Sequence, residues 1–229
     1  MGILDLLFPK YCVNCRKLGS YLCPNCFAYI SFDDSGTCLI CLRASIDGVT
    51  HPACRSRYAI DAAFASIAYK GVVKKLIYSF KYKPYLTDLK TVLGDLFYES
   101  LIQQEGFTQI LEMSPVLVPI PLHSSKLKSR GYNHAQILAS QLAKRLNLQQ
   151  ADLLKRVKKT ASQFGLKREE RRINVAGAFA VSPNVLLSQY PNIFLVDDIL
   201  TTGATLLEAA NVLKRAGARR VWGIALARD

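Results

Sequence analysis

The chain has 229 residues, half of them hydrophobic, and a formal net charge of +13. This length suits one medium domain or a main domain with a small appendage, and the apolar fraction excludes an intrinsically disordered chain. No apolar run approaches the ~20 residues that a membrane span needs. Residues 1–9 are too short, and too poor in basic residues, for a signal peptide. We therefore expect a cytoplasmic protein with no membrane span.

All seven cysteines lie in the first 54 residues and follow a repeated C-x-x-C spacing. Such pairs place two thiolates on one tetrahedral metal ion. Since the cytoplasm disfavours disulfides, we expect one or two structural zinc ions. The expected ligands form two sequential quartets: Cys12, Cys15, Cys23 and Cys26, then Cys38, Cys41, His51 and Cys54. For the second quartet, the alternative is a surface histidine and a buried thiol. Residues 1–57 are thus expected to form a zinc-binding module and residues 58–229 a second domain.

The second domain alternates strand and helix patterns. Apolar stretches predict strands over residues 61–69, 116–120, 177–181, 193–196 and 221–227. Helical periodicity predicts helices over residues 71–82, 86–103 and 135–146, and again from residue 206 onwards. This alternation implies an α/β fold with a mostly parallel sheet, whose ligands bind at the carboxyl ends of the strands.

The positive charge is concentrated between Lys126 and Arg172, where 13 Lys and Arg face 3 Asp and Glu. A solvated surface, a polyphosphate ligand and a nucleic acid are all compatible with this excess. The rigid turn Pro119-Ile120-Pro121 precedes a cluster that includes Arg130, and together they suit a pyrophosphate, although prolines also simply punctuate strand ends. Residues 154–164, with Arg156, are either a hood over the site or a solvated helix-loop.

The most informative segment is residues 193–205. A buried strand is followed by Asp197 and Asp198, then by a loop rich in hydroxyl groups, and then by a helix. The first N–H groups of a helix attract anions, and Gly203 allows a phosphate to approach the backbone. Paired carboxylates suit a ligand that carries hydroxyls, and they also suit Mg²⁺. A ribose 5-phosphate has this combination of hydroxyls and phosphate. The alternative is an ordinary strand-to-helix turn capped by Asp and Thr.

This segment resembles the phosphoribosyl pyrophosphate (PRPP) motif of type I phosphoribosyltransferases at every position. The resemblance implies that Asp197 and Asp198 bind the ribose 2- and 3-hydroxyls and that Mg²⁺ accompanies PRPP. It also implies a type I phosphoribosyltransferase-like sheet with helices on both faces. The implied 5-phosphate loop consists of Leu200, Thr201, Thr202, Gly203, Ala204 and Thr205.

The whole chain resembles the ComF family, also known as ComFC or GntX-like proteins, which combine a zinc module with a phosphoribosyltransferase domain. The matching motifs are Leu7-Phe8-Pro9, Val118-Pro119-Ile120-Pro121, Arg130-Gly131-Tyr132-Asn133, the PRPP motif, and the series Arg156, Thr160, Gln163, Arg171, Asn174 and Phe179. Only His51 departs from the expected cysteine. The resemblance implies a role in natural transformation and DNA uptake, with handling of single-stranded DNA. It also implies partnership with a competence helicase and a DNA-processing protein.

The expected function is therefore the binding of Mg²⁺–PRPP, with pyrophosphate near Pro119, Ile120, Pro121, Arg130 and Arg156. In related 6-oxopurine enzymes an acidic base occupies the position of Thr201, so that acceptor class is disfavoured here. No catalytic residue and no acceptor can be named from the sequence. The alternative is a non-catalytic adaptor that senses PRPP or a nucleotide, or binds DNA.

Overall fold

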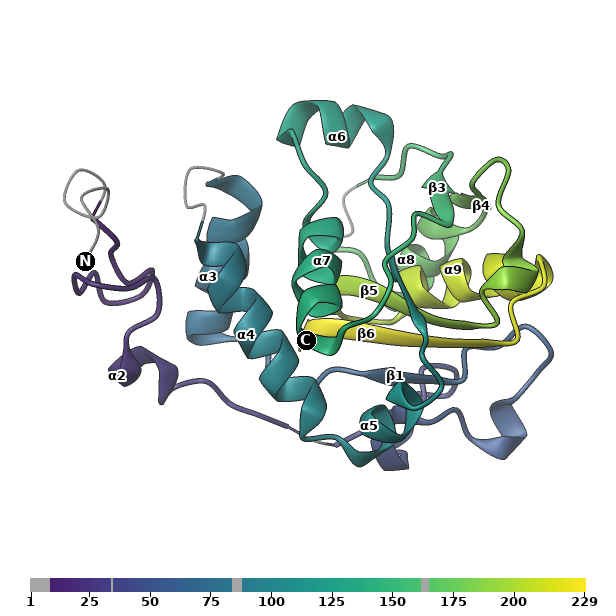
Figure 1. Ribbon diagram of the computed structural model, residues 1–229, viewed down its shortest axis with the longest axis horizontal. Helices are drawn as coiled ribbons and strands as arrows, with labels where there is room; N and C mark the ends of the chain where they lie inside the picture. The colour runs from purple at the N-terminus through teal and green to yellow at the C-terminus, as the bar shows by residue number, and fades with distance from the viewer. Residues whose placement is uncertain (1–8, 34, 84–87, 162–164) are drawn as a thin grey trace.

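The computed structural model describes residues 9–33, 35–83, 88–161 and 165–229 (Figure 1). Its centre is a wholly parallel four-stranded sheet in the order β1-β6-β5-β2. The strands are β1 (Ala62–Phe64), β2 (Val116–Pro119), β5 (Asn192–Leu200) and β6 (Arg220–Arg228). A second, antiparallel pair joins β3 (Leu154–Arg156) to β4 (Phe179–Val181). The expected α/β class and parallel sheet are confirmed.

Helices cover both faces of this sheet, as expected (Figure 1). One face packs against α3 (Gly71–Tyr82), α4 (Leu89–Ile102) and α7 (His134–Leu146). The other packs against α9 (Ala204–Arg215), which α8 (Arg168–Val175) contacts in turn. The shorter helices are α2 (Pro24–Phe27), α5 (Glu105–Leu111) and α6 (Ser124–Arg130), with single 3₁₀ turns η1 (Ile46–Gly48), η2 (Pro52–Cys54) and η3 (Leu187–Gln189). None of the described helices is both long and apolar enough to cross a lipid bilayer.

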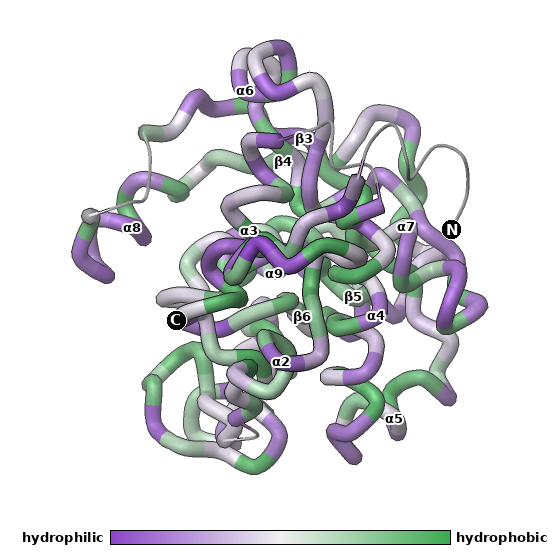
Figure 2. The backbone as a smooth tube through the Cα atoms, turned by 90° about the vertical axis from the view of Figure 1, so that its left-hand side faces the viewer, coloured by the Kyte–Doolittle hydropathy of each residue, from purple (hydrophilic) through white to green (hydrophobic). Residues whose placement is uncertain are grey.

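The packing of β5 on both faces explains why residues 193–196 are all apolar. Ile193 and Leu195 join the cluster under α9, whereas Phe194 and Val196 join the cluster under α4 and α7. Because successive side chains of a strand point to opposite faces, a strand between two helical layers needs apolar residues at every position. In Figure 2 this hydrophobic centre contrasts with the hydrophilic α8 at the periphery.

Two strands differ most in length from their predictions. β5 continues to Leu200, four residues beyond the predicted end, because β6 lies alongside and pairs Asp197 with Ala225 and Ile199 with Ala227. The two acids therefore belong to the strand itself, and the loop begins at Thr201. β1 is shorter than predicted, since only isolated bridges continue it towards Tyr69.

The cysteine-rich segment covers the outer edge of β1. The backbone N–H of Asp33 donates to Ser66 O, and that of Ala68 donates to Ser31 O. Further along, Val49 forms an antiparallel bridge with Ala62. An exposed strand edge invites pairing with other chains, and this segment satisfies the edge within the same molecule.

Candidate functional site

The structure brings the four possible metal ligands of each sequential quartet close together. Within each quartet, the nearest ligand atoms all lie within 4.8 Å of one another. In the first, Cys15 Sγ lies 3.5 Å from Cys23 Sγ. None of the seven cysteines forms a disulfide. Four thiolates, or three thiolates and one imidazole, at this spacing fit one tetrahedral zinc ion per quartet, so the residues present are suited to two structural zinc ions.

His51 has the geometry of a metal ligand rather than of a surface loop residue. Its Nδ1 lies 3.2 Å from Cys41 Sγ, and its Nε2 lies 3.0 Å from the carbonyl oxygen of Ala44. A proton on Nε2 that donates to Ala44 leaves the Nδ1 lone pair directed at the quartet, as in metal-bound histidines. Hydrogen bonds from the backbone and side chain of Arg43 lower the pKa of Cys41 to about 5, which favours the thiolate.

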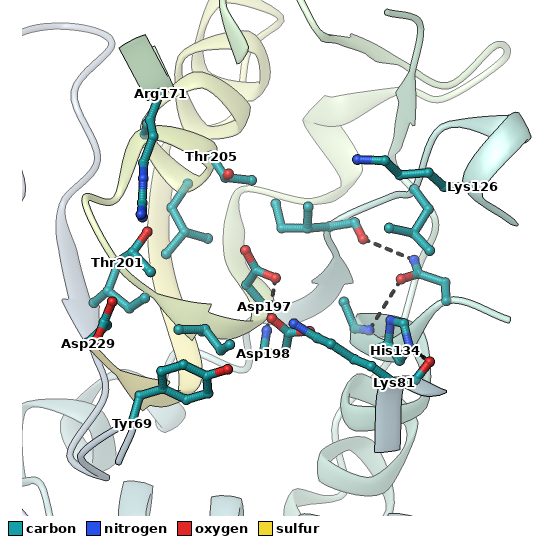
Figure 3. Close-up of a pocket in the computed structure, with 18 of the residues that line it drawn as sticks. Tyr69, Lys81, Lys126, His134, Arg171, Asp197, Asp198, Thr201, Thr205 and Asp229 are labelled. Carbon is teal, nitrogen blue, oxygen red and sulfur yellow. Dashed lines mark hydrogen bonds and ion pairs between the residues drawn. The ribbon is translucent and has the colours of Figure 1, made fainter. Parts of the chain in front are cut away.

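A pocket of about 630 Å³ opens at the carboxyl ends of β5 and β2 (Figure 3). This volume lies in the range of small-molecule sites. Ten of the expected site residues line it: Ile120, Arg130, Arg156, Asp197, Asp198, Leu200, Thr201, Gly203, Ala204 and Thr205. Pro119, Pro121 and Thr202 are not among the lining residues. Pro119 lies within β2, beside Val196 of β5.

The loop between β5 and α9 has the geometry of an anion cradle. Gly203 precedes α9 with a positive φ of 72°, and Leu207 N–H is the donor to its carbonyl oxygen. The N–H groups of the first helical turn therefore have no intrahelical acceptor and carry the positive end of the helix dipole. The hydroxyl of Thr202 is buried without a hydrogen-bond partner among the described residues. Glycine is required here because the left-handed region disfavours other side chains.

The paired acids lie beside this loop in very different surroundings. Asp197 accepts a hydrogen bond of 2.8 Å from the backbone N–H of Asp198. Burial, and then the negative charge of Asp198, raise the pKa of Asp197 to about 7. Asp198 instead forms an ion pair with Lys81 of α3, with Nζ 2.7 Å from Oδ2. Burial opposes the charge of Lys81, but Asp198 outweighs it, and the pKa of Lys81 is raised.

Cations surround the rest of the pocket. Arg156 donates a hydrogen bond of 2.6 Å to Thr160 Oγ1, and its guanidinium lies 5.2 Å from the ring centre of Phe179. Burial, followed by the charges of Arg156 and Arg130, lowers the pKa of Lys126. Six lysines and arginines line the pocket against three aspartates. This excess of positive charge suits a ligand with several phosphates.

Several lining residues were not predicted from the sequence. Lys81 was placed only within the predicted helix over residues 71–82, since no local pattern reveals an ion pair between elements so far apart in the chain. Asp229 is a third carboxylate in the pocket, and its N–H donates to Leu200 O over 3.0 Å, next to Thr201 (Figure 3). The buried His134 also lines the pocket, and burial lowers its pKa to about 4. Its position just before the predicted helix over residues 135–146 was the only signal in the sequence.

Comparison with known proteins identifies the class. Residues 127–229 match the family model described as the phosphoribosyl transferase domain, so this part of the chain is such a domain. Competence protein F of Haemophilus influenzae is 37% identical over 123 residues, which cover 52% of this chain and 54% of that protein. DNA utilization protein YhgH of Salmonella typhimurium is 26% identical over 217 residues, or 87% of this chain and 93% of that protein.

Competence protein ComFC of Streptococcus pneumoniae is 24% identical over 221 residues, or 95% of this chain and 87% of that protein. The matches of 30% identity or more span about half the length of those relatives. Together with the domain match, these relatives confirm the expected resemblance: the chain is similar to ComF-type proteins and carries a phosphoribosyl transferase domain.

Proposed function

We propose that the protein binds Mg²⁺–PRPP in the pocket at the end of β5 and transfers its phosphoribosyl group to an acceptor. One observation carries this proposal. The paired carboxylates, the start of α9 and an excess of cations all open into the same cavity of about 630 Å³. These are complementary to the three parts of PRPP: ribose hydroxyls, 5-phosphate and pyrophosphate.

Each part of the ligand has a chemical partner. The 5-phosphate would accept hydrogen bonds from the loop at Thr201–Thr205 and the first N–H groups of α9. Asp197 and Asp198 would accept hydrogen bonds from the ribose hydroxyls, and the ion pair with Lys81 would hold the Asp198 carboxylate in position. The pyrophosphate would lie towards Arg130 and Arg156. Mg²⁺, when bound, would neutralise charge on the pyrophosphate oxygens.

The proposed transfer replaces one bond at C1 of the ribose with another. The bond from C1 to the pyrophosphate oxygen breaks, the acceptor bonds to C1, and the acceptor loses a proton. Positive charge develops on the ribose ring while negative charge develops on the leaving pyrophosphate. The aspartates would stabilise the former and the arginines the latter, and such preorganised charges lower the barrier.

Asp229 is our candidate for the group that accepts the proton. Thr201 occupies the position at which related 6-oxopurine enzymes have an acidic base. The hydrogen bond from Asp229 N–H to Leu200 O holds another carboxylate beside this position. A carboxylate within reach of the acceptor would act as general base. If it does not, the alternative is a protein that senses PRPP without turnover, a possibility favoured by the threonine at position 201.

We further propose that the acceptor or partner is connected with single-stranded DNA, in the cytoplasm during natural transformation. The names of the relatives, which refer to competence and DNA utilization, support this role. Tyr78 and Tyr82 at the pocket are more than half exposed, and their ring centres lie 4.8 Å apart. The Arg130 guanidinium lies 5.4 Å from the ring centre of Tyr82. Exposed aromatic rings beside cations suit unpaired bases. A competence helicase and a DNA-processing protein remain the proposed protein partners.

Two measurements test the proposal. Isothermal titration calorimetry should detect Mg²⁺–PRPP binding to the wild type and none to an Asp197→Ala/Asp198→Ala variant that keeps its circular dichroism spectrum. Pyrophosphate release should then be measured with free bases and with single-stranded DNA. Unchanged PRPP affinity in the double variant would refute the assignment of the ribose. Tight binding without any pyrophosphate release would favour the sensing protein.

A further inference from the structure

Leu39, in the turn between Cys38 and Cys41, packs directly against the phosphate loop. Its side chain is 3% exposed. A Cβ atom added to Gly203 would lie 2.9 Å from Leu39 Cδ1 and 3.0 Å from Cδ2. The isobutyl group of Leu39 therefore fills the space in which a side chain at position 203 would stand.

The first quartet has no equivalent contact among the described residues. Val13 is the counterpart of Leu39 in the Cys12–Cys15 turn, and it packs against the core cluster on the α3 and α4 side of the sheet. Leu39 belongs instead to the cluster that contains Ala204 and Leu206 at the start of α9. The two quartets thus support different parts of the molecule.

Polar contacts fix the same turn to the elements around the loop. Arg168 of α8 donates a hydrogen bond of 3.1 Å to the carbonyl oxygen of Ile40. Arg228, at the end of β6, donates to the carbonyl oxygen of Ser35 over 2.5 Å and also to the hydroxyl of Thr37. The turn is therefore held against α8, and the residues that lead into it are held against β6.

We propose that the second quartet positions the phosphate loop through Leu39, which acts as a positioning residue without touching the ligand. Glycine is the least restricted residue, so a loop that hinges on Gly203 needs outside packing to keep its N–H groups aligned. A metal ion bound to Cys38, Cys41, His51 and Cys54 would fix the turn that carries Leu39. The expected effect on PRPP affinity rests on the function proposed above, whereas the expected ordering of the loop by Leu39 does not.

The order of the loop can be measured by hydrogen–deuterium exchange in the full-length protein without ligand. We expect Leu39→Ala to accelerate exchange of the amides of residues 202–206 by about tenfold, within the usual range of coupling between sites. The matched control Val13→Ala removes a similar side chain from the other turn and should leave these amides unchanged. Leu39→Met, which restores the volume, should restore protection.

The metal ligands give a second comparison. Cys41→Ala should accelerate exchange in residues 202–206 as Leu39→Ala does, while Cys15→Ala should accelerate exchange only around the first quartet. If Leu39→Ala does not fold, Leu39→Val makes a smaller gap and should produce a smaller acceleration. Loop exchange that is the same in the wild type and the Leu39 variants, or equally faster in Val13→Ala, would overturn the proposal.

Measuring PRPP affinity distinguishes a failure of the positioning role of Leu39 from a failure of the proposed function. Titration with Mg²⁺–PRPP should show an affinity about tenfold lower for Leu39→Ala than for Val13→Ala. If the wild type binds no PRPP while loop exchange still depends on Leu39, the proposed function fails and the positioning role stands. If PRPP binds and its affinity is equal in both variants, the role of Leu39 in binding is refuted.

Discussion

Lys81 and Asp198 form an ion pair across the pocket, with Nζ 2.7 Å from Oδ2 and both side chains less than one-fifth exposed. This pair joins α3 to the end of β5, and therefore joins the helical layer to the strand that carries the paired acids. Two adjacent carboxylates repel each other, and the cation beside Asp198 offsets part of this repulsion. The pair thus explains how the two aspartates coexist before any ligand binds.

Replacing Lys81 should destabilise the protein and weaken PRPP binding together. Lys81→Met keeps the length of the side chain but leaves Asp198 without its cation. We expect a loss of about 2 kcal/mol in the free energy of unfolding at pH 8, as for a charged hydrogen bond with one partner removed. Urea unfolding measures this loss, and Lys81→Arg is the control that should retain most of the stability. Equal stability of the wild type and Lys81→Met would contradict the importance of the pair.

Asp197 should make the folded protein less stable as the pH rises. Its pKa is raised from 3.8 to about 7, so the folded protein keeps a proton that the unfolded chain releases. Since the folded state binds more protons between these values, the free energy of unfolding contributed by Asp197 falls across that range. Asp197→Asn removes this penalty and should stabilise the protein at pH 8 by up to about 4 kcal/mol, with little difference near pH 3. Urea unfolding at several pH values provides the test, which fails if the variant is the less stable at pH 8.

PRPP binding should have the opposite pH dependence. A ribose hydroxyl donates to a carboxylate, so the affinity should rise with pH until Asp197 is ionised near pH 7. Below this value we expect a fall of about tenfold per pH unit. Because the phosphates of the ligand also titrate, inorganic pyrophosphate is the control that lacks the ribose. A PRPP affinity with the same pH profile as that of pyrophosphate would mean that Asp197 does not bind the sugar.

The elements with strong local patterns were predicted well. α3 begins and ends where its apolar periodicity predicts, at Gly71 and Tyr82. α6 was missed because it buries none of its residues and so has no apolar face. It depends on local contacts instead: His123 accepts a hydrogen bond from Ser125 N–H, and Gly131 ends the helix with a positive φ of 82°.

The site was predicted only where its residues are neighbours in sequence. Asp197 and Asp198 belong to one motif, so their shared position at a strand end follows from the sequence. The end of β5 was placed too early because two acids suggest a loop, whereas pairing with β6 extends the strand. Lys81 and Leu39 reach the site from elements that only the folded chain brings together, and no local pattern reveals such contacts. Gln163 belongs to the family motif but lies outside the described residues.

Removing zinc should affect the amino-terminal part first. A segment of this size buries too little apolar surface to fold alone, so bound zinc would supply much of its folding free energy. Elemental analysis should find two zinc ions per chain, and His51→Ala should reduce the content to one. A chelator should then accelerate amide exchange around both quartets. Exchange that is indifferent to the chelator, in a protein shown to have lost its metal, would contradict a structural role.

Asp229→Asn should separate binding from turnover. The substitution keeps the side chain's shape but removes its ability to accept a proton, so the affinity for Mg²⁺–PRPP should change little. With an acceptor that supports pyrophosphate release, kcat should fall by about 10²- to 10⁴-fold, the usual contribution of a general base. Glu105→Gln, on the exposed start of α5, is the matched control and should leave both quantities unchanged. An unaltered kcat in Asp229→Asn would exclude this carboxylate as the base, because the asparagine amide cannot accept the proton in its place.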